Sequence, residues 1–144
     1  MSDGDLRQIF SAHLRDFHWQ AVETWSTGQG VPDVNYCGGG IEGWIENKAT
    51  ATRAVDLSPG QIGWIERRIR AGGRVFIAVR RVTTAGPRKG AACDELHLFP
   101  GSCARSLLED GLNDLKALGI WPGGPGKWNW DTIRVLLLKA KIIQ

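Results

Sequence analysis

The sequence predicts an α/β fold in which helices flank a small mixed β-sheet. Two extended segments are separated by three consecutive glycines at 38–40, a pattern typical of a β-hairpin and therefore of an antiparallel pair. A helical segment that starts at Pro59 separates the second of them from a continuous apolar run at 75–79. Strand–helix–strand order favours a right-handed crossover between parallel strands. Leucine-rich stretches after residue 100 predict extra C-terminal helices.

The composition indicates one domain, spanning residues 1–144, that does not enter a membrane. A chain of 144 residues is long enough for one hydrophobic core and short for two. No apolar run approaches the roughly 20 residues that a helix needs to span a bilayer, so we expect a cytoplasmic protein. Three cysteines without a Cys-x-x-Cys pair argue against a disulfide framework and against a cysteine zinc site.

The N-terminal region should form an amphipathic helix. Apolar residues recur at helical spacing from Asp5 to Trp19, so one face of this segment should pack on the core. The stretch from Ala21 to Trp25 reads as a short strand or as an extended entry into the next loop, and it carries Glu23.

The predicted hairpin gathers charged side chains. Asp33 stands near the start of its first strand, and Glu46 and Lys48 lie on the second. Residues two apart on a strand project from the same face, so Glu46 and Lys48 project together while Asn47 points away. Pairing through the glycine turn brings Asp33 close to Glu46, which indicates a site for a hard divalent cation. The alternative is an exposed ion pair between Glu46 and Lys48, which would contribute only about 0–1 kcal/mol.

A helix start signal follows the hairpin. Ser58 fits the N-cap position, Pro59 the first helical position, and Gln61 the third position of a capping box. The helix should end at the glycines 72–73. The apolar run at 75–79 then predicts a strand that is buried on both faces.

The C-terminal third is predicted to be mostly helical. A short strand at 95–99 precedes a helical segment that Ser102 caps and that carries the leucines up to Leu118, with Gly111 as a point where it can be interrupted. The segment 121–130 is rich in Gly, Pro and Trp and should be irregular. It is either a mobile aromatic loop whose tryptophans stack on bases or a strap packed on the core. Asp131 is the expected cap of the last helix.

Basic residues are concentrated between positions 67 and 89, where no acidic residue occurs. Part of this basic block falls in a loop at 83–92 that should be exposed. Such a block suits contact with a polyanion, although a solvated helix face followed by a basic loop explains the charge equally well. The members of the block are Arg67, Arg68, Arg70, Arg74, Arg80, Arg81, Arg88 and Lys89.

Asp33 followed by Glu46-x-Lys48 resembles the signature of the PD-(D/E)XK nuclease superfamily. Within it, the sequence most resembles the small Holliday-junction resolvases and VRR-NUC nucleases of phage and bacterial genomes. The resemblance covers Glu23 to Val82 and includes Gln61 in a Leu-Ser-x-x-Gln context. It implies a restriction-endonuclease-like core and a cytoplasmic location in a bacterial or phage-infected cell.

The resemblance also implies a metal-dependent endonuclease that hydrolyses the phosphodiester bonds of DNA. The cofactor would be Mg²⁺, with Mn²⁺ as a substitute. The implied catalytic residues are Asp33, Glu46, Lys48 and Gln61. The implied metal ligands are Asp33, Glu46, the backbone carbonyl of Asn47 and, as an outer carboxylate, Glu23.

DNA is the expected partner, held by basic side chains on either side of the scissile bond. Nothing in the sequence resembles a base-reading motif, so recognition of shape in branched or junction DNA is favoured. A nucleic-acid-binding module without activity and a general nuclease that acts on single strands or ends are the alternatives. A homodimer, common among resolvases, is compatible with the sequence. The expected DNA contacts are Arg67, Arg70, Arg74, Arg88 and Lys89.

Overall fold

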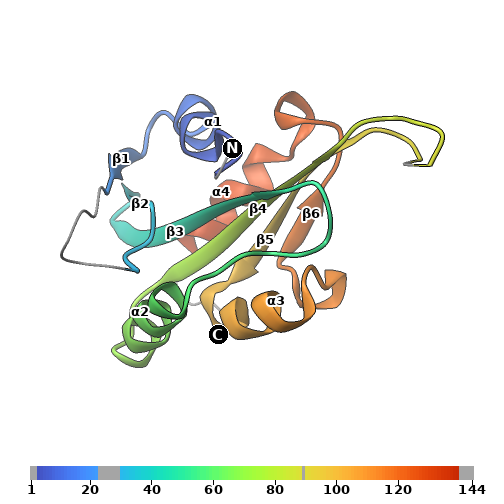
Figure 1. The fold of residues 1–144 in the computed structure, drawn as a ribbon. Coiled ribbons are helices and arrows are strands. Elements are labelled where there is room, and N and C mark those ends of the chain that lie inside the picture. The colour runs from blue at the N-terminus through green and yellow to red at the C-terminus, as the bar shows by residue number, and fades with distance from the viewer. Residues whose placement is uncertain (1–2, 23–29, 89, 140–144) are drawn as a thin grey trace.

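A mixed sheet with helices on both of its faces makes up the fold, as the sequence predicts (Figure 1). The computed structural model describes residues 3–22, 30–88 and 90–139. The strands are β1 (His18–Ala21), β2 (Val34–Gly38), β3 (Ile41–Thr50), β4 (Val75–Thr83), β5 (Cys93–Pro100) and β6 (Gly119–Trp121). The helices are α1 (Leu6–His13), α2 (Pro59–Arg70), α3 (Ala104–Asp110) and α4 (Trp130–Leu138), with short 3-10 turns at Gly101–Cys103, Asp114–Lys116 and Pro125–Lys127. None of the described helices is long and apolar enough to cross a membrane.

The six strands lie side by side in chain order, β1 to β6. The predicted hairpin is confirmed: β2 and β3 pair antiparallel, and Gly39 and Gly40 make the turn with φ angles of 55° and 79°. The predicted crossover is confirmed as well, because α2 connects β3 to β4 and these two strands are parallel. All other neighbouring strands are antiparallel.

Each face of the sheet carries its own hydrophobic cluster. Helices α1 and α4 cover one face, where Phe10, Tyr36 and Ile133 are fully buried. The hydroxyl of Tyr36 donates a hydrogen bond of 2.6 Å to the carbonyl of Leu137 and so connects β2 to α4. Helices α2 and α3 cover the opposite face, which also carries the side chain of Glu46. The predicted charged site therefore lies on the α2 face.

The N-terminal helix is shorter than predicted, because α1 ends at His13 and residues 18–21 form the edge strand β1. Trp19 pairs with Tyr36 across the two strands, and its indole nitrogen donates to the carbonyl of Leu14 at 2.9 Å. The spacing of these residues also suits a helix, but aromatic packing against β2 stabilises them as a strand. The strand predicted from Ala21 begins earlier, and its residues 23–25 lie outside the described part of the chain.

The C-terminal helix predictions are partly wrong. Ser102 lies in a 3-10 turn and does not cap a helix, and α3 ends at Gly111, whose φ is 74°. Leu115 is 96% exposed, so the leucines do not form one helical face, and β6 follows them. The cap of α4 is Asn129, whose side chain accepts from the backbone N–H of Thr132; Asp131 lies in the first turn.

Segment 121–130 is a packed strap. Trp128 is 3% exposed, and the ring of Trp130 packs edge-on against Phe10 at a centroid distance of 5.6 Å. The indole nitrogens donate to backbone carbonyls, that of Trp130 to Pro125 at 2.8 Å. Since these two side chains fill the core on the α1 and α4 face, their rings are not available to stack on bases.

Candidate active site

The register of β2 and β3 brings Asp33 and Glu46 together. Val34 pairs with Ile45, so Asp33, one residue before β2, lies across from Glu46. A carboxylate oxygen of Asp33, Oδ2, accepts a hydrogen bond of 3.0 Å from the backbone N–H of Asn47. This bond fixes the Asp33 side chain at the point where β2 and β3 diverge.

Glu46 is buried without compensation for its charge. Its side chain is 1% exposed, and Oε1 has no hydrogen-bond partner among the described residues. Burial and, second, the neighbouring Asp33 carboxyl together raise the pKa of Glu46 to about 9, against the opposing charge of Lys48. At neutral pH Glu46 therefore holds a proton unless a cation takes its place.

The backbone carbonyl of Asn47 faces the same site. The N–H of Trp44 bonds the carbonyl of Arg74, so on β3 the backbone of Trp44 and of every second residue after it faces β4. Asn47 is an odd-numbered residue between these positions, so its backbone N–H and carbonyl face the other way, toward β2. Its N–H donates to Asp33, and its carbonyl faces the same side. Two carboxylates and a carbonyl are the oxygen donors that magnesium prefers, with waters completing the shell. The donor set therefore fits a hard divalent cation, although the described residues hold no cluster of three His, Cys, Asp or Glu side chains.

Lys48 is held beside the carboxyl pair by α2. Its Nζ donates to Oε1 of Gln61 at 3.1 Å. The same oxygen accepts from the backbone N–H of Ser58 at 2.9 Å, and the Ser58 hydroxyl accepts from the Gln61 N–H at 3.1 Å. Gln61 thus completes the predicted capping box and positions the ammonium group at once.

A glycine contact that the sequence does not signal holds the site together. Gly30 has a φ of 88°, and a Cβ there would lie 2.1 Å from the carbonyl oxygen of Gly60. The chain that leads to Asp33 therefore lies directly against the first turn of α2. Gln61, which holds Lys48, follows Gly60 directly. The approach of Gly30 to Gly60 therefore places the segment that carries Asp33 next to the helix turn that holds Lys48.

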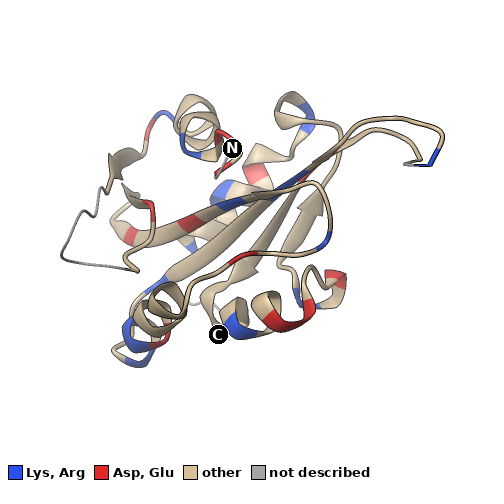
Figure 2. Cartoon of the chain, viewed as in Figure 1, with Lys and Arg blue, Asp and Glu red and all other residues tan. Residues whose placement is uncertain are grey.

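The basic block is spread over several elements (Figure 2). Arg67 and Arg70 are exposed on α2. Arg74 is half-buried at the start of β4, where its guanidinium donates to the carbonyl of Lys139. Arg88 is exposed in the loop between β4 and β5, which projects away from the sheet.

Two of the predicted residues lie outside the described part of the chain: Lys89, a predicted DNA contact, and Glu23, the predicted outer carboxylate.

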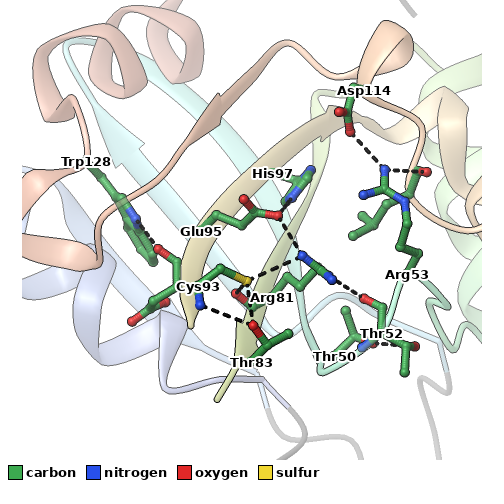
Figure 3. Close-up of polar contacts among 12 residues, drawn as sticks. Thr50, Thr52, Arg53, Arg81, Thr83, Cys93, Glu95, His97, Asp114 and Trp128 are labelled. Carbon is green, nitrogen blue, oxygen red and sulfur yellow. Dashed lines mark hydrogen bonds and ion pairs between the residues drawn. The ribbon is translucent and has the colours of Figure 1, made fainter. Parts of the chain in front are cut away.

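Two other arginines of the block, Arg80 and Arg81 on β4, are neutralised by carboxylates on β5. Arg80 binds both carboxylate oxygens of Asp94, at 2.9 Å and 2.7 Å. Arg81 approaches Glu95 at 3.4 Å, and the same glutamate oxygen contacts Nε2 of His97 at 2.9 Å (Figure 3). These ion pairs connect β4 to β5 and leave both guanidinium groups committed to the fold.

Next to the carboxyl pair is a group that sequence reasoning missed, the tryptophan–arginine cluster of Trp44, Trp64 and Arg68. The two indole rings meet edge to face with centroids 5.2 Å apart. The guanidinium carbon of Arg68 lies 4.6 Å from the centroid of Trp64 and 5.5 Å from that of Trp44. Its sequence signal is spacing: Trp44 precedes Glu46 by two residues on one strand face, and Trp64 follows Gln61 by nearly one helical turn.

Comparison with known proteins finds structural likeness without a sequence match. No family model matches the sequence, and no curated protein matches it. Among solved structures, the Holliday junction resolvase Hjc of Archaeoglobus fulgidus, an archaeal hyperthermophile, aligns with a TM-score of 0.44 and 16% identity. The alignment covers 67% of this chain and 74% of that one. A likeness of this degree does not assign a family or an activity.

Proposed function

We propose that this chain is a metal-dependent endonuclease of the PD-(D/E)XK type that hydrolyses phosphodiester bonds in DNA and selects branched or junction substrates. One observation carries the proposal: the buried carboxyl group of Glu46 lies next to the half-buried carboxyl group of Asp33 and shares a strand face with Lys48. An unsatisfied buried carboxylate oxygen has no structural benefit, since it destabilises the fold by about 1–3 kcal/mol. A cation bridging the two carboxylates would remove that penalty.

The residues of the site divide the work of hydrolysis. Asp33, Glu46 and the carbonyl of Asn47 would hold Mg²⁺ or Mn²⁺, which neutralises charge on the phosphoryl oxygens and lowers the pKa of a bound water. Lys48, held by Gln61 at 3.1 Å, places a positive charge where negative charge develops in the transition state. Arg67 and Arg70 on α2 are free to contact flanking phosphates.

Cleavage assays test the proposal directly. The wild-type chain is incubated with Mg²⁺ and four DNA substrates: a four-way junction, a flap, a linear duplex and a single strand. We expect cleavage that EDTA abolishes and that Asp33→Ala and Glu46→Ala each reduce at least a hundredfold. Glu109→Ala, at an exposed carboxylate of α3, is the control for cleavage, and Glu42→Ala, at an exposed carboxylate on the same strand as Glu46, is the control for metal binding. Undiminished cleavage by both site variants would refute the site assignment.

Metal binding provides a readout that is independent of activity. Mn²⁺ titration followed by electron paramagnetic resonance should show a bound ion in the wild type and in the Glu42→Ala variant, and none in Glu46→Ala. DNA binding without cleavage under either metal would identify an inactive binding module instead. Equal cleavage of linear single strands and junctions would identify a nuclease without preference for branches.

A further inference from the structure

A pocket of about 400 Å³ adjoins the tryptophan–arginine cluster on the side away from Lys48. Trp44 and Arg68, which stack on each other, form one wall, and the lining continues through the glycines 72–73 to Arg74, whose carbonyl accepts from the N–H of Trp44. Because Trp44 and Glu46 lie on one strand face two residues apart, the pocket begins about 6.6 Å along β3 from the carboxyl pair. A polymer that passes over the pair therefore reaches the pocket with its next unit.

The lining suits a flat, anionic unit. Four of its residues are glycines, at 40, 43, 72 and 73, so backbone rather than side chains forms much of the surface. Its charged residues are Arg68, Arg74 and Glu42, two positive charges against one negative, and the guanidinium of Arg74 also donates to the carbonyl of Lys139. An aromatic wall with a guanidinium plane and an excess of positive charge is the combination that binds a base and its phosphate.

Packing between α2 and β3 explains why Trp44 and Trp64 touch, but it does not explain Arg68. This arginine is exposed, and it has no carboxylate partner among the described residues. It is nevertheless placed over both rings, at 5.5 Å and 4.6 Å from their centroids. A guanidinium stacked in this way is pre-oriented, and its outer face is available to a second planar group.

We propose that the tryptophan–arginine cluster and this pocket bind an unpaired nucleotide of the DNA strand that enters the site, with its base stacked on the Trp44–Arg68 wall. The inference rests on the proposed function for the identity of the polymer. In a paired duplex both faces of a base are covered by its neighbours, so the pocket selects strands with an unstacked nucleotide next to the scissile phosphate. Flaps and junctions with opened branch points present such nucleotides.

Binding measurements in EDTA separate this inference from catalysis. The full chain is titrated with a fluorescein-labelled 12-nucleotide single strand and with the matching 12-base-pair duplex, and affinity is read by anisotropy. We expect Arg68→Lys, which keeps the charge and loses the planar stack, to weaken single-strand binding about tenfold, the effect of losing one stacked base. Duplex binding should change less than twofold. Arg7→Lys, at an exposed arginine of α1 on the other face of the sheet, is the control and should change neither affinity more than twofold.

A second probe reports stacking itself. 2-Aminopurine placed within the single strand should be quenched on binding to the wild type and to Arg7→Lys, and quenched less by Arg68→Lys and by Trp44→Leu. Circular dichroism checks that the Arg68→Lys and Trp44→Leu variants are folded. Equal effects of Arg68→Lys and Arg7→Lys, or no binding of either probe, would overturn the inference. If the chain cleaves DNA but does not bind the single strand in preference to the duplex, this inference alone is refuted. If it prefers the single strand but does not cleave DNA in Mg²⁺, the proposed function alone is refuted.

Discussion

Replacing Glu46 by Gln should stabilise the protein at pH 8 while abolishing its activity. Glutamine matches the protonated form of the carboxyl group, which is the form that the buried site favours. In the folded chain burial, together with the neighbouring Asp33 carboxyl, raises the pKa of Glu46 from 4.5 to about 9, so the folded state binds this proton more tightly than the unfolded state. The contribution of Glu46 to the stability of the wild type is therefore largest below pH 4.5 and is lost as the pH rises toward 9.

The size of the effect follows from the pH interval. Each pH unit between the two pKa values changes the free energy of unfolding by about 1.4 kcal/mol, so the interval from pH 5 to pH 8 sets an upper bound of about 4 kcal/mol. Charge sharing with Asp33 and Lys48 reduces this, and we expect Glu46→Gln to gain about 2 kcal/mol over the wild type at pH 8 and almost nothing at pH 5.

Urea unfolding in EDTA at pH 5, 6.5 and 8, followed by tryptophan fluorescence, measures this difference. Glu42→Gln serves as the control, since Glu42 is exposed on the same strand, and its free energy of unfolding should stay within about 0.5 kcal/mol of the wild type. Mg²⁺ should then raise the stability of the wild type at pH 8 and leave Glu46→Gln unchanged. Parallel pH profiles for the wild type and Glu46→Gln would refute the claim that this carboxyl group is buried without compensation.

Three further substitutions test how the site is built. Gln61→Ala removes both the capping interaction and the acceptor of Lys48, so we expect a loss of about 1 kcal/mol in urea unfolding together with a lower kcat; an unchanged kcat would show that Gln61 only caps the helix. Gly30→Ala would place a Cβ 2.1 Å from the Gly60 carbonyl, so Mn²⁺ affinity should fall if the contact sets the geometry of the pair. Asn47→Leu replaces a buried amide that lacks partners among the described residues, and it should raise stability by about 1–2 kcal/mol while cleavage persists, because only the backbone carbonyl is assigned a role. Lost cleavage in a folded Asn47→Leu variant would contradict that role.

The elements that the sequence predicts well are those that local chemistry determines. Gly39 and Gly40 permit the positive φ angles of the β2–β3 turn, and Ser58 with Gln61 satisfies the first N–H groups of α2 whatever the rest of the chain does. The C-terminal third depends on distant contacts instead. Helix α3 ends at Gly111, next to which the N–H of Leu112 donates to the carbonyl of Arg53 at 2.7 Å, and Trp128 within the strap is buried in the core. Spacing of apolar residues alone cannot distinguish that outcome from a longer helix.

The basic block also shows the difference between what local sequence determines and what depends on distant contacts. Arg81 on β4 pairs with Glu95 on β5, and Arg80 on β4 binds Asp94 on β5. The acidic partners follow the block in sequence by only a few residues, yet their pairing needs the register of β5. Charge counting therefore overstated the positive charge available to a polyanion, although Arg67 and Arg70 on α2 are exposed.

The carboxyl site is determined partly by local sequence and partly by distant contacts. Alternation along β3 and the hairpin turn suffice to bring Asp33, Glu46 and Lys48 together, so the sequence predicts their convergence. It does not separate a metal site from an exposed ion pair, because that depends on how α2 and α3 bury the sheet. In the structure Glu46 is 1% exposed and the ammonium of Lys48 bonds Gln61 at 3.1 Å, and no ion pair joins Glu46 to Lys48 among the described residues. An ion pair would satisfy Glu46 and need nothing more; a buried carboxylate whose nearby lysine is held elsewhere is stabilised only by a proton or a cation.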